Sequence, residues 1–398
     1  MSIPVAEYPY IRVTIDTRGL TPVATRAFGN VAIVGDAGGF GTATAGEPEM
    51  IGSEADARRL FADVDASGAI SNDGADAGPL YHSLRDILAQ SPGPSRIYAV
   101  ATGDTAGGDP DYAGGLAAVA AAPVQFVSLA RVTAPDALAA LATHVADASS
   151  AGNKRMGVAM VNPDLAVAAG DTFAEAADDA YGDLADDEGR MILVAARVAT
   201  TAGDPSSDLA AATMAAIAGY PPHVSVLLKQ VRGVRVPLAR QFTGSEVTQL
   251  AEAAIIPLID PELVAGDGIF IGSGRSYNTA DPGRLYVDVV RVLDDIEYRL
   301  KAGLIGVIGN VRIDRLGLQG LVGRIDAILG PLVASRVLDG YTVDVPLLPI
   351  LETEEADRSP GSAQTLTNAR TSRIVEILLT VTYAGAIHFL DINLALRA

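Results

Sequence analysis

GIFIGSGRSYNTADPGRLYVDVVRVLDDIEYRLKAG, residues Gly268 to Gly303, carries the clearest structural signal in the chain. Its first five residues, Gly268–Gly272, predict a short buried strand. Asp281 followed by Pro282 is typical of the start of a helix, and we expect that helix to end at Gly303. The stretch therefore predicts a strand, a turn and a long helix in succession.

The predicted helix has an apolar face and a charged stripe. The apolar positions are Leu285, Val289, Val292, Leu293, Ile296 and Leu300. The charged positions alternate in sign at spacings of three and four: Arg284, Asp288, Arg291, Asp295 and Arg299. Such a stripe is typical of a solvated face with ion pairs one turn apart. We interpret it as structural and not catalytic.

Strands and helices also alternate over the N-terminal half. Predicted strands cover Asn30–Gly35, Ser95–Val100, Gln125–Ala130 and Met156–Val161, and predicted helices cover 53–61, 81–90, 134–148, 171–185 and 210–219. Further on we expect a helix from the capping box at 243–246 to Ala254, a helix at 318–338 interrupted at 330–331, and a strand at 374–383. The alternation predicts an α/β layer in a mixed α/β protein.

The composition excludes several classes of protein. The chain has 398 residues, a formal net charge of -19 and no cysteine. Disulfide scaffolds, thiolate metal sites and cysteine nucleophiles are therefore excluded, and the acidity argues against binding nucleic acid. The first residues do not resemble a secretory signal, and the longest apolar run, Leu116–Ala130, is too short to span a membrane. We expect assembly in the cytoplasm.

Both ends of the chain carry a segment that alternates between apolar and polar residues. The apolar positions are Ile11, Val13 and Ile15 at one end, and Ile392, Leu394 and Leu396 at the other. The turn Thr17–Gly19 and the break Ala384–Ala386 separate these segments from the rest of the chain. An unpaired strand of this kind favours pairing with another chain. The alternative is that both strands pair within one subunit.

A glycine-rich loop, Gly35–Gly41, follows the first predicted strand of the α/β layer and suggests a nucleotide site. It matches neither G-x-G-x-x-G, because Ala37 takes the second glycine position, nor a P-loop, because no Gly-Lys-Ser/Thr ends it. No predicted helix begins directly after it to receive a phosphate. We interpret it as a structural loop and expect no cofactor.

Metal and hydrolase sites are also weakly supported. Asp63, Asp65 and Ser67 occupy EF-hand positions 1, 3 and 5, but position 12 is Gly74 where a bidentate glutamate is required. Whether these residues bind calcium stays open. The histidines at 82, 144, 223 and 388 show no metal-binding spacing, and no G-x-S-x-G motif occurs. We therefore predict no catalytic residues and no enzyme.

Three stretches together resemble the contractile tail sheath proteins of bacteriophages, pyocin-type particles and contractile injection systems. Residues 30–64 resemble the family's early strand, glycine-rich loop and helix, and residues 78–100 resemble the next helix and strand. Gly274-Arg275-Ser276 and the following helix, with Arg291 and Ile296-Glu297, are similar to the family's "Trp-Gly-Ala-Arg-Thr-Leu" strand and Arg-rich helix. Ile271 stands where the family has the tryptophan.

The resemblance implies a mechanical role. Subunits of such sheaths form six-fold rings that stack helically around an inner tube, and contraction drives the tube through a target envelope. It implies a multi-domain fold with a conserved inner domain, an inserted outer α/β domain and terminal β-arms that add strands to a neighbour's sheet. We assign residues 1–25 to the N-terminal arm, 26–235 to the outer domain, 236–383 to the inner domain and 384–398 to the C-terminal arm.

The implied partners are further copies of the chain, the tube protein, and baseplate and tail terminator proteins, within a virion tail or contractile particle. Candidate tube contacts are Arg312, Arg315, Arg324 and Asp326, because a contact that must release suits charged groups. The alternative is a small-molecule- or nucleotide-binding α/β protein or enzyme that uses the Gly35–Gly41 loop.

Overall fold

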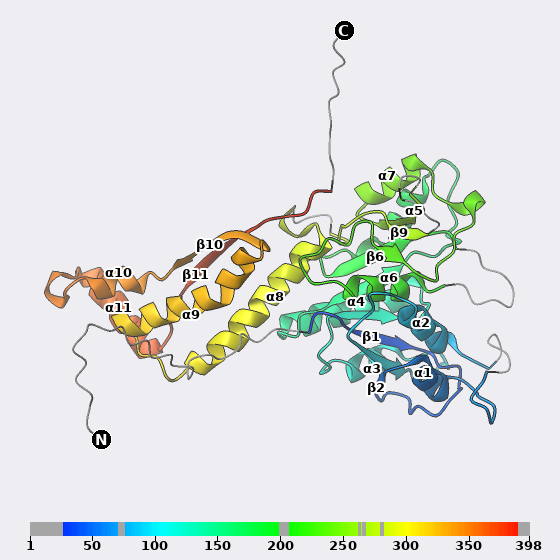
Figure 1. Cartoon of the computed structure of the whole chain (residues 1–398), viewed down its shortest axis with the longest axis horizontal. Helices are drawn as coiled ribbons and strands as arrows, with labels where there is room; N and C mark the ends of the chain where they lie inside the picture. The colour runs from blue at the N-terminus through cyan, green and yellow to red at the C-terminus, as the bar shows by residue number, and fades with distance from the viewer. Residues whose placement is uncertain are drawn as a thin grey trace, which may run out of the picture. The chain divides into compact units, whose positions relative to one another are not determined.

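The fold is taken from a computed structural model that describes residues 27–70, 76–198, 207–261, 264, 268–278 and 282–388 (Figure 1). The described chain divides into two compact units. The larger, the sheet unit, contains Ala27–Glu297, Val333–Tyr341 and the residues from Val381 onward. The smaller, the helical unit, contains Tyr298–Leu332 and Thr342–Thr380.

The sheet unit is built on one large mixed sheet, with nine strands among the described residues. They are β1 (Asn30–Gly35), β2 (Glu49–Ile51), β3 (Arg96–Ala101), β4 (Phe126–Leu129), β5 (Met156–Met160), β6 (Met191–Ala195), β7 (Gln230–Val231), β8 (Ile256–Ile259) and β9 (Ile269–Ile271). Their order is β2-β3-β1-β4-β5-β6-β8-β9-β7. The strands from β3 to β8 in this order are parallel, and β2, β9 and β7 are antiparallel to their neighbours.

Helices cover both faces of this sheet. Helices α1 (Glu54–Phe61), α2 (Pro79–Leu88) and α6 (Leu209–Ala218) share a core with one face. Helices α3 (Tyr112–Ala118), α4 (Pro135–Ser150), α5 (Phe173–Tyr181) and α7 (Gly244–Glu252) share a core with the other. Strand residues alternate between the two cores, with Val31 and Ile33 on one side and Ala32 and Val34 on the other. Because both faces are covered, the central strands are apolar throughout.

Helix α8 (Val287–Leu304) begins later than the sequence predicts. Pro282–Arg284 form a short 3-10 turn, and the chain returns beside β9 through a bridge between Arg275 and Tyr286. The Val287 amide then donates to the Gly274 carbonyl at 3.0 Å. The prediction of a helix starting at Asp281 is wrong, because the loop after β9 holds residues 284–286 in a non-helical path.

The helical unit contains α9 (Arg315–Ala334, to Leu332), α10 (Leu347–Glu352) and α11 (Pro360–Ser372). Leu318, Val345 and Leu347 form a buried cluster within it. The predicted interruption at Gly330-Pro331 is wrong, since α9 continues through Pro331. The carbonyl four residues earlier belongs to Ala327, an exposed residue, so water can replace the lost donor.

Two further strands, β10 (Leu338–Asp344) and β11 (Leu378–Tyr383), form a separate two-stranded sheet. The predicted strand at 374–383 therefore begins four residues later, and β10 lies in a stretch where we expected no strand. The predicted mixed α/β class is confirmed. The expected domain change at residue 236 falls between β7 and β8, which belong to the same sheet.

Candidate assembly surfaces

The charged residues in the first half of α8 are buried. Asp288, Arg291 and Asp294 are each less than 9% exposed, whereas Leu293, from the predicted apolar face, is 38% exposed. The expectation of a solvated stripe is therefore wrong for this half of the helix. Arg284 lies in the 3-10 turn before the helix and is not part of a helical stripe.

Each of these buried groups has a partner far away in the sequence. The Tyr383 hydroxyl donates to Asp288 Oδ2 at 2.6 Å, and Arg291 Nη2 donates to the Tyr220 carbonyl at 2.7 Å. Arg190 Nη1 donates to Asp294 Oδ2 at 2.6 Å. Since a buried charge without a partner is strongly unfavourable, these contacts hold the first half of α8 against the sheet unit.

The pKa values reflect this burial. Desolvation lowers the pKa of Arg291 to about 10, although nearby carboxylates, Asp288 first, oppose the shift. Desolvation alone would also lower the pKa of Arg190, but its hydrogen bond to Asp294 raises it overall. Burial and the bond to Asp288 raise the pKa of Tyr383, so its hydroxyl remains a donor at neutral pH.

The two-stranded sheet formed by β10 and β11 is partly exposed. Along β11, exposed and half-buried residues alternate, and Leu378 is 64% exposed. At one end of the sheet, the Ala384 amide donates to the Val337 carbonyl at 3.4 Å. A two-stranded sheet is marginally stable alone and gains stability from added strands.

The proposed arm residues lie outside the described residues. They are Ile11, Val13 and Ile15 in the N-terminal arm, and Ile392, Leu394 and Leu396 in the C-terminal arm. The structure describes the C-terminal segment as far as His388.

All four candidate tube contacts are exposed: Arg312, Arg315, Arg324 and Asp326. Arg315 is the first residue of α9, and its Nε lies 3.9 Å from Glu352 Oε1. Ile325 and Leu329 are buried, so they hold α9 in place while Arg324 remains accessible. The four residues thus share accessibility to solvent.

Helix α9 is, by length and composition alone, apolar enough to cross a membrane, and 28% of its most apolar window is buried. One such helix in a protein is weak evidence for a membrane span, and α9 carries Arg324 and Asp326 near its middle. Its exposed apolar residues, among them Leu316 at 80%, are better suited to contact with protein.

The Gly35–Gly41 loop follows the carboxyl end of β1, where the order of the parallel strands reverses and open α/β sheets often bind ligands. Packing explains Gly35 and Gly41, whereas at Gly39 a Cβ would meet nothing within 4 Å and the positive φ of +77° explains the glycine. A Cβ on Gly41, which has φ +79°, would lie 2.2 Å from the Leu60 carbonyl oxygen, and one on Gly78 would meet Ala37. The start of α2 packs on the loop, and Leu80 donates to the Asp36 carbonyl at 3.0 Å.

The calcium-like loop is stabilised by its own backbone. Asp65 Oδ1 accepts bonds from the amide and hydroxyl of Ser67, at 2.8 and 2.6 Å, and from the Ala69 amide. These bonds lower the pKa of Asp65, the Ser67 hydroxyl most of all. Among the described residues no group of three or more acidic or histidine side chains is arranged to hold a metal ion. An aspartate that closes a turn accounts for this motif.

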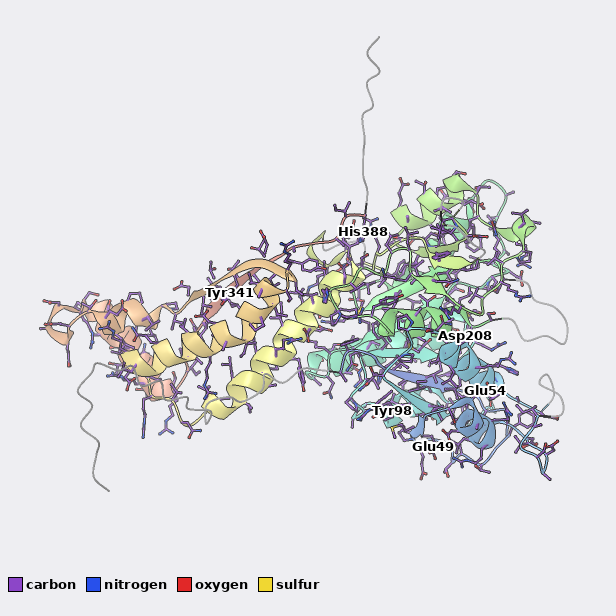
Figure 2. All side chains as sticks on the ribbon, viewed as in Figure 1. Glu49, Glu54, Tyr98, Asp208, Tyr341 and His388 are labelled. Atoms are coloured by element: carbon purple, nitrogen blue, oxygen red, sulfur yellow. The ribbon has the colours of Figure 1, made fainter. Side chains whose placement is uncertain are left out.

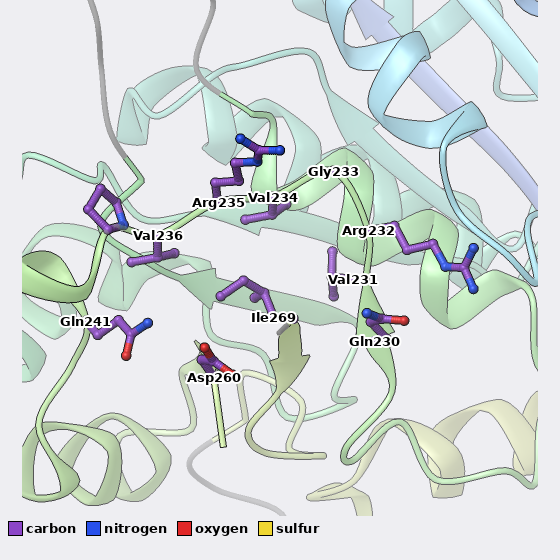
Figure 3. Close-up of a pocket in the computed structure, with 12 residues that line it drawn as sticks. Gln230, Val231, Arg232, Gly233, Val234, Arg235, Val236, Gln241, Asp260 and Ile269 are labelled. Carbon is purple, nitrogen blue, oxygen red and sulfur yellow. The ribbon is translucent and has the colours of Figure 1, made fainter. Parts of the chain in front are cut away.

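A concavity of about 610 Å³ lies at the β7 edge of the sheet (Figure 3). Val231 and Ile269 line it, while Gln230, Gln241 and Asp260 add polar groups. Among the residues that the structure describes, no histidine contributes to its lining. This combination has no arrangement of nucleophile and base that would indicate catalysis.

Comparison with solved structures gives full-length matches. A chain of the six-fold symmetrised anti-feeding prophage baseplate matches with 15% identity and a TM-score of 0.64, covering 99% of this chain and 100% of that one. A chain of the contracted PVC sheath complex of an extracellular contractile injection system matches with 13% identity and a TM-score of 0.65, covering 99% of this chain and 98% of that one. A sheath tail protein from Listeria innocua matches with 12% identity and a TM-score of 0.55, covering 92% of this chain and 97% of that one. The chain has the fold of contractile sheath proteins.

No protein-family model matches the sequence, and no curated protein matches it either. The resemblance inferred from the sequence is nevertheless confirmed for the fold.

Within this sheath fold, the Gly274-Arg275-Ser276 motif builds the connection between β9 and α8. Arg275 Nη1 donates to the Ala251 carbonyl at 3.0 Å, at the end of α7, and the Ser276 hydroxyl donates to the Arg284 carbonyl at 2.7 Å. The motif therefore has a structural role in this chain. The partners of α8, Tyr383 among them, had no signal in the sequence because they lie far from it along the chain.

Proposed function

We propose that the chain is a structural subunit of a contractile tail sheath, polymerising as stacked six-fold rings around an inner tube. The observation that carries this proposal is the end-to-end match, which covers both this chain and the solved chains almost completely. A match over one domain would be compatible with many functions, because folds are shared widely. Here both compact units and their connection recur together in proteins of such assemblies.

The arms and the β10–β11 sheet supply the means of polymerisation. In the proposed polymer, the N-terminal arm with Ile11, Val13 and Ile15 and the C-terminal arm with Ile392, Leu394 and Leu396 add strands to neighbouring subunits. The exposed two-stranded sheet is the acceptor. Main-chain hydrogen bonds then connect the subunits while the bodies rearrange.

Contraction needs no nucleotide in this proposal. An extended sheath is metastable, and contraction releases free energy by burying surface between subunits. The hydrogen bonds of the Gly35–Gly41 loop support this reading, because the amides of Gly38, Phe40 and Gly41 already donate to protein oxygens and are not open to a phosphate. We therefore propose that the chain is not an enzyme, and that these internal bonds outweigh the position of the loop at the reversal of strand order, which would otherwise favour nucleotide binding.

We propose further that the helical unit belongs to the inner domain and that α9 faces the tube. The support is the accessibility of Arg312, Arg315, Arg324 and Asp326 in a unit with a small buried cluster. The sheet unit would then correspond to the outer α/β domain, with its boundary beyond the residue 235 first assigned. Baseplate and tail terminator proteins are the expected partners at the sheath ends, and assembly would occur in the cytoplasm.

Electron microscopy of the purified full-length protein tests the proposal. We expect cogwheel-like rings or hollow tubes with six-fold symmetry. Monodisperse particles that bind nucleotide and never polymerise would contradict it.

The role of the arms has a separate test. Deleting residues 1–16 or 387–398 should give folded, soluble subunits that fail to form rings or tubes, because strand addition is lost while both compact units remain. Circular dichroism checks folding, and electron microscopy checks assembly. Normal polymers from both deletions would show that the arms are dispensable.

A further inference from the structure

The segment that leads from β11 toward the C-terminal arm is fastened at two points. It runs from Tyr383 to His388, with Ala384, Gly385, Ala386 and Ile387 between them. Gly385 has φ +63°, a left-handed conformation that glycine adopts without strain, and Ile387 is 83% exposed. The middle of the segment therefore contributes little burial, and its position depends on its two ends.

Tyr383 provides the first fastening point. Its hydroxyl donates to Asp288 Oδ2 at 2.6 Å and lies 3.3 Å from the His223 carbonyl. Asp288 is in the first turn of α8 and is 3% exposed. A hydrogen bond to a buried carboxylate is stronger than one between neutral groups, so this end is held firmly.

His388 provides the second fastening point (Figure 2). Its Nε2 lies 2.8 Å from the Ser225 hydroxyl, and its ring packs edge-on against Tyr286 with centroids 4.8 Å apart. On another side it approaches Gly274, where a Cβ would come within 2.8 Å of His388 Cε1. The imidazole is thus held by a hydrogen bond, an aromatic contact and a space that only glycine leaves open.

Two hollows lie beside the segment from Tyr383 to His388, so few of its residues pack against the sheet unit. A hollow of about 410 Å³ is lined by the segment itself together with Tyr286, Asp288 and Val289. A second, of about 600 Å³, is lined by Leu227, Leu228 and other residues, with His388 at its border. The segment does not fill these hollows, so the specific contacts of Tyr383 and His388 determine its path.

We propose that Tyr383 and His388 are positioning residues for assembly, which fix the point on the sheet unit from which the C-terminal arm departs. This inference rests on the proposed sheath function. If Tyr383 alone held the chain, Ile392 would be nine Cα-to-Cα steps from the fixed point, a reach of about 30 Å. With His388 fixed, four residues remain, a reach of about 14 Å.

The shorter reach has two consequences. The arm strand samples a much smaller volume, so its effective concentration at the neighbour's sheet rises. Load on the arm also passes to α8 through Asp288 and to the β9–α8 loop through Tyr286 and Gly274. A movement of the sheet unit is then transmitted through the arm to the neighbouring subunit.

Four variants of the full chain test this inference. His388→Ala and Ser225→Ala remove the hydrogen bond from opposite sides, and Gly274→Ala displaces the ring without changing the arm. Ile387→Ala is the matched control, because it truncates an exposed apolar side chain next to His388. We expect the first three to retain the wild-type melting temperature and to polymerise about tenfold less, and the control to behave as wild type.

Proton NMR of the soluble subunit separates fastening from assembly. The chain has four histidines, so their ring signals can be assigned by substitution. In wild type the His388 ring should relax with the rigid body and show contacts to Tyr286. In Ser225→Ala and Gly274→Ala its signal should sharpen and lose those contacts.

Each outcome has one meaning. Wild-type polymers together with His388→Ala polymers of the same yield and pitch would overturn the positioning role. A His388 ring that is mobile in wild type would overturn the fastening, whether or not polymers form. Failure of wild type to polymerise, with His388 rigid, would contradict the proposed sheath function and leave the fastening supported.

Discussion

The first half of α8 and the helix α9 both carry charged residues but use them in opposite ways. In α8, Asp288, Arg291 and Asp294 are buried, and each has a partner within 2.7 Å. In α9, Arg315 and Arg324 are exposed, and the Arg315 contact with Glu352 is 3.9 Å long. The comparison teaches that charge spacing alone does not indicate a solvated face. Carbonyl groups and charged side chains from distant segments decide whether the face can be buried.

The largest expected effect breaks the α8 side of this comparison. Arg190→Met removes the 2.6 Å ion pair to the buried Asp294 carboxylate, which should cost about 3–5 kcal/mol of unfolding free energy. Arg315→Met on α9 is the control and should cost less than about 1 kcal/mol, because an exposed pair contributes little. Urea unfolding measures both. Equal losses would remove the contrast between the helices.

A smaller effect is expected at another buried carboxylate. Asp86 accepts a bond from the Asp208 amide at 2.7 Å, and Arg131 Nη2 is 3.9 Å away. Burial raises the pKa of Asp86 to about 6. A raised pKa stabilises the folded state below the ordinary value, near 4, and this stability is lost as the pH rises through about 6.

Asp86→Asn should therefore gain about 2 kcal/mol of stability relative to wild type as the pH rises from 4.5 to 7.5, because the amide does not titrate. Thermal unfolding of both proteins at the two pH values measures the difference. A difference that does not change with pH would show that Asp86 does not titrate in this range.

The smallest effect per subunit is expected on α9. Arg324→Glu should leave subunit stability unchanged, since the side chain is exposed. If α9 faces the tube, the variant loses at most about 1 kcal/mol at each contact, but the repeat of that contact along a particle multiplies the loss. Electron microscopy should show empty contracted sheaths beside bare tubes. Particles as extended and as sheathed as wild type would exclude Arg324 as a tube contact.

Local signals predicted much of the sheet unit. The apolar run at 30–35 became β1 within the predicted bounds, and the capping box at Thr243 and Glu246 starts α7 as expected. These features depend on neighbours in sequence, where hydrophobic period and capping act directly. The start of α8 was mispredicted because Gly274 and Ser276, not Asp281, determine it.

The functional surfaces were less accessible to sequence analysis. The arm strands and the tube contacts stay predictions. Strand β10, LDGYTVD, contains Gly340 and two aspartates, which favour turns over strands, and pairing with β11 outweighs that preference. The contacts of His388 have no signal in the sequence, since Ser225 and Tyr286, which hold it, lie far away along the chain.

The edges of the large sheet have a consequence for the life of the free protein. Its outermost strands, β2 and β7, have three and two residues. When many copies of such a chain are present, the edge strands of two copies can pair by accident. Strands this short offer another chain few backbone groups with which to form hydrogen bonds. The short edge strands therefore limit accidental pairing between copies of the sheet unit.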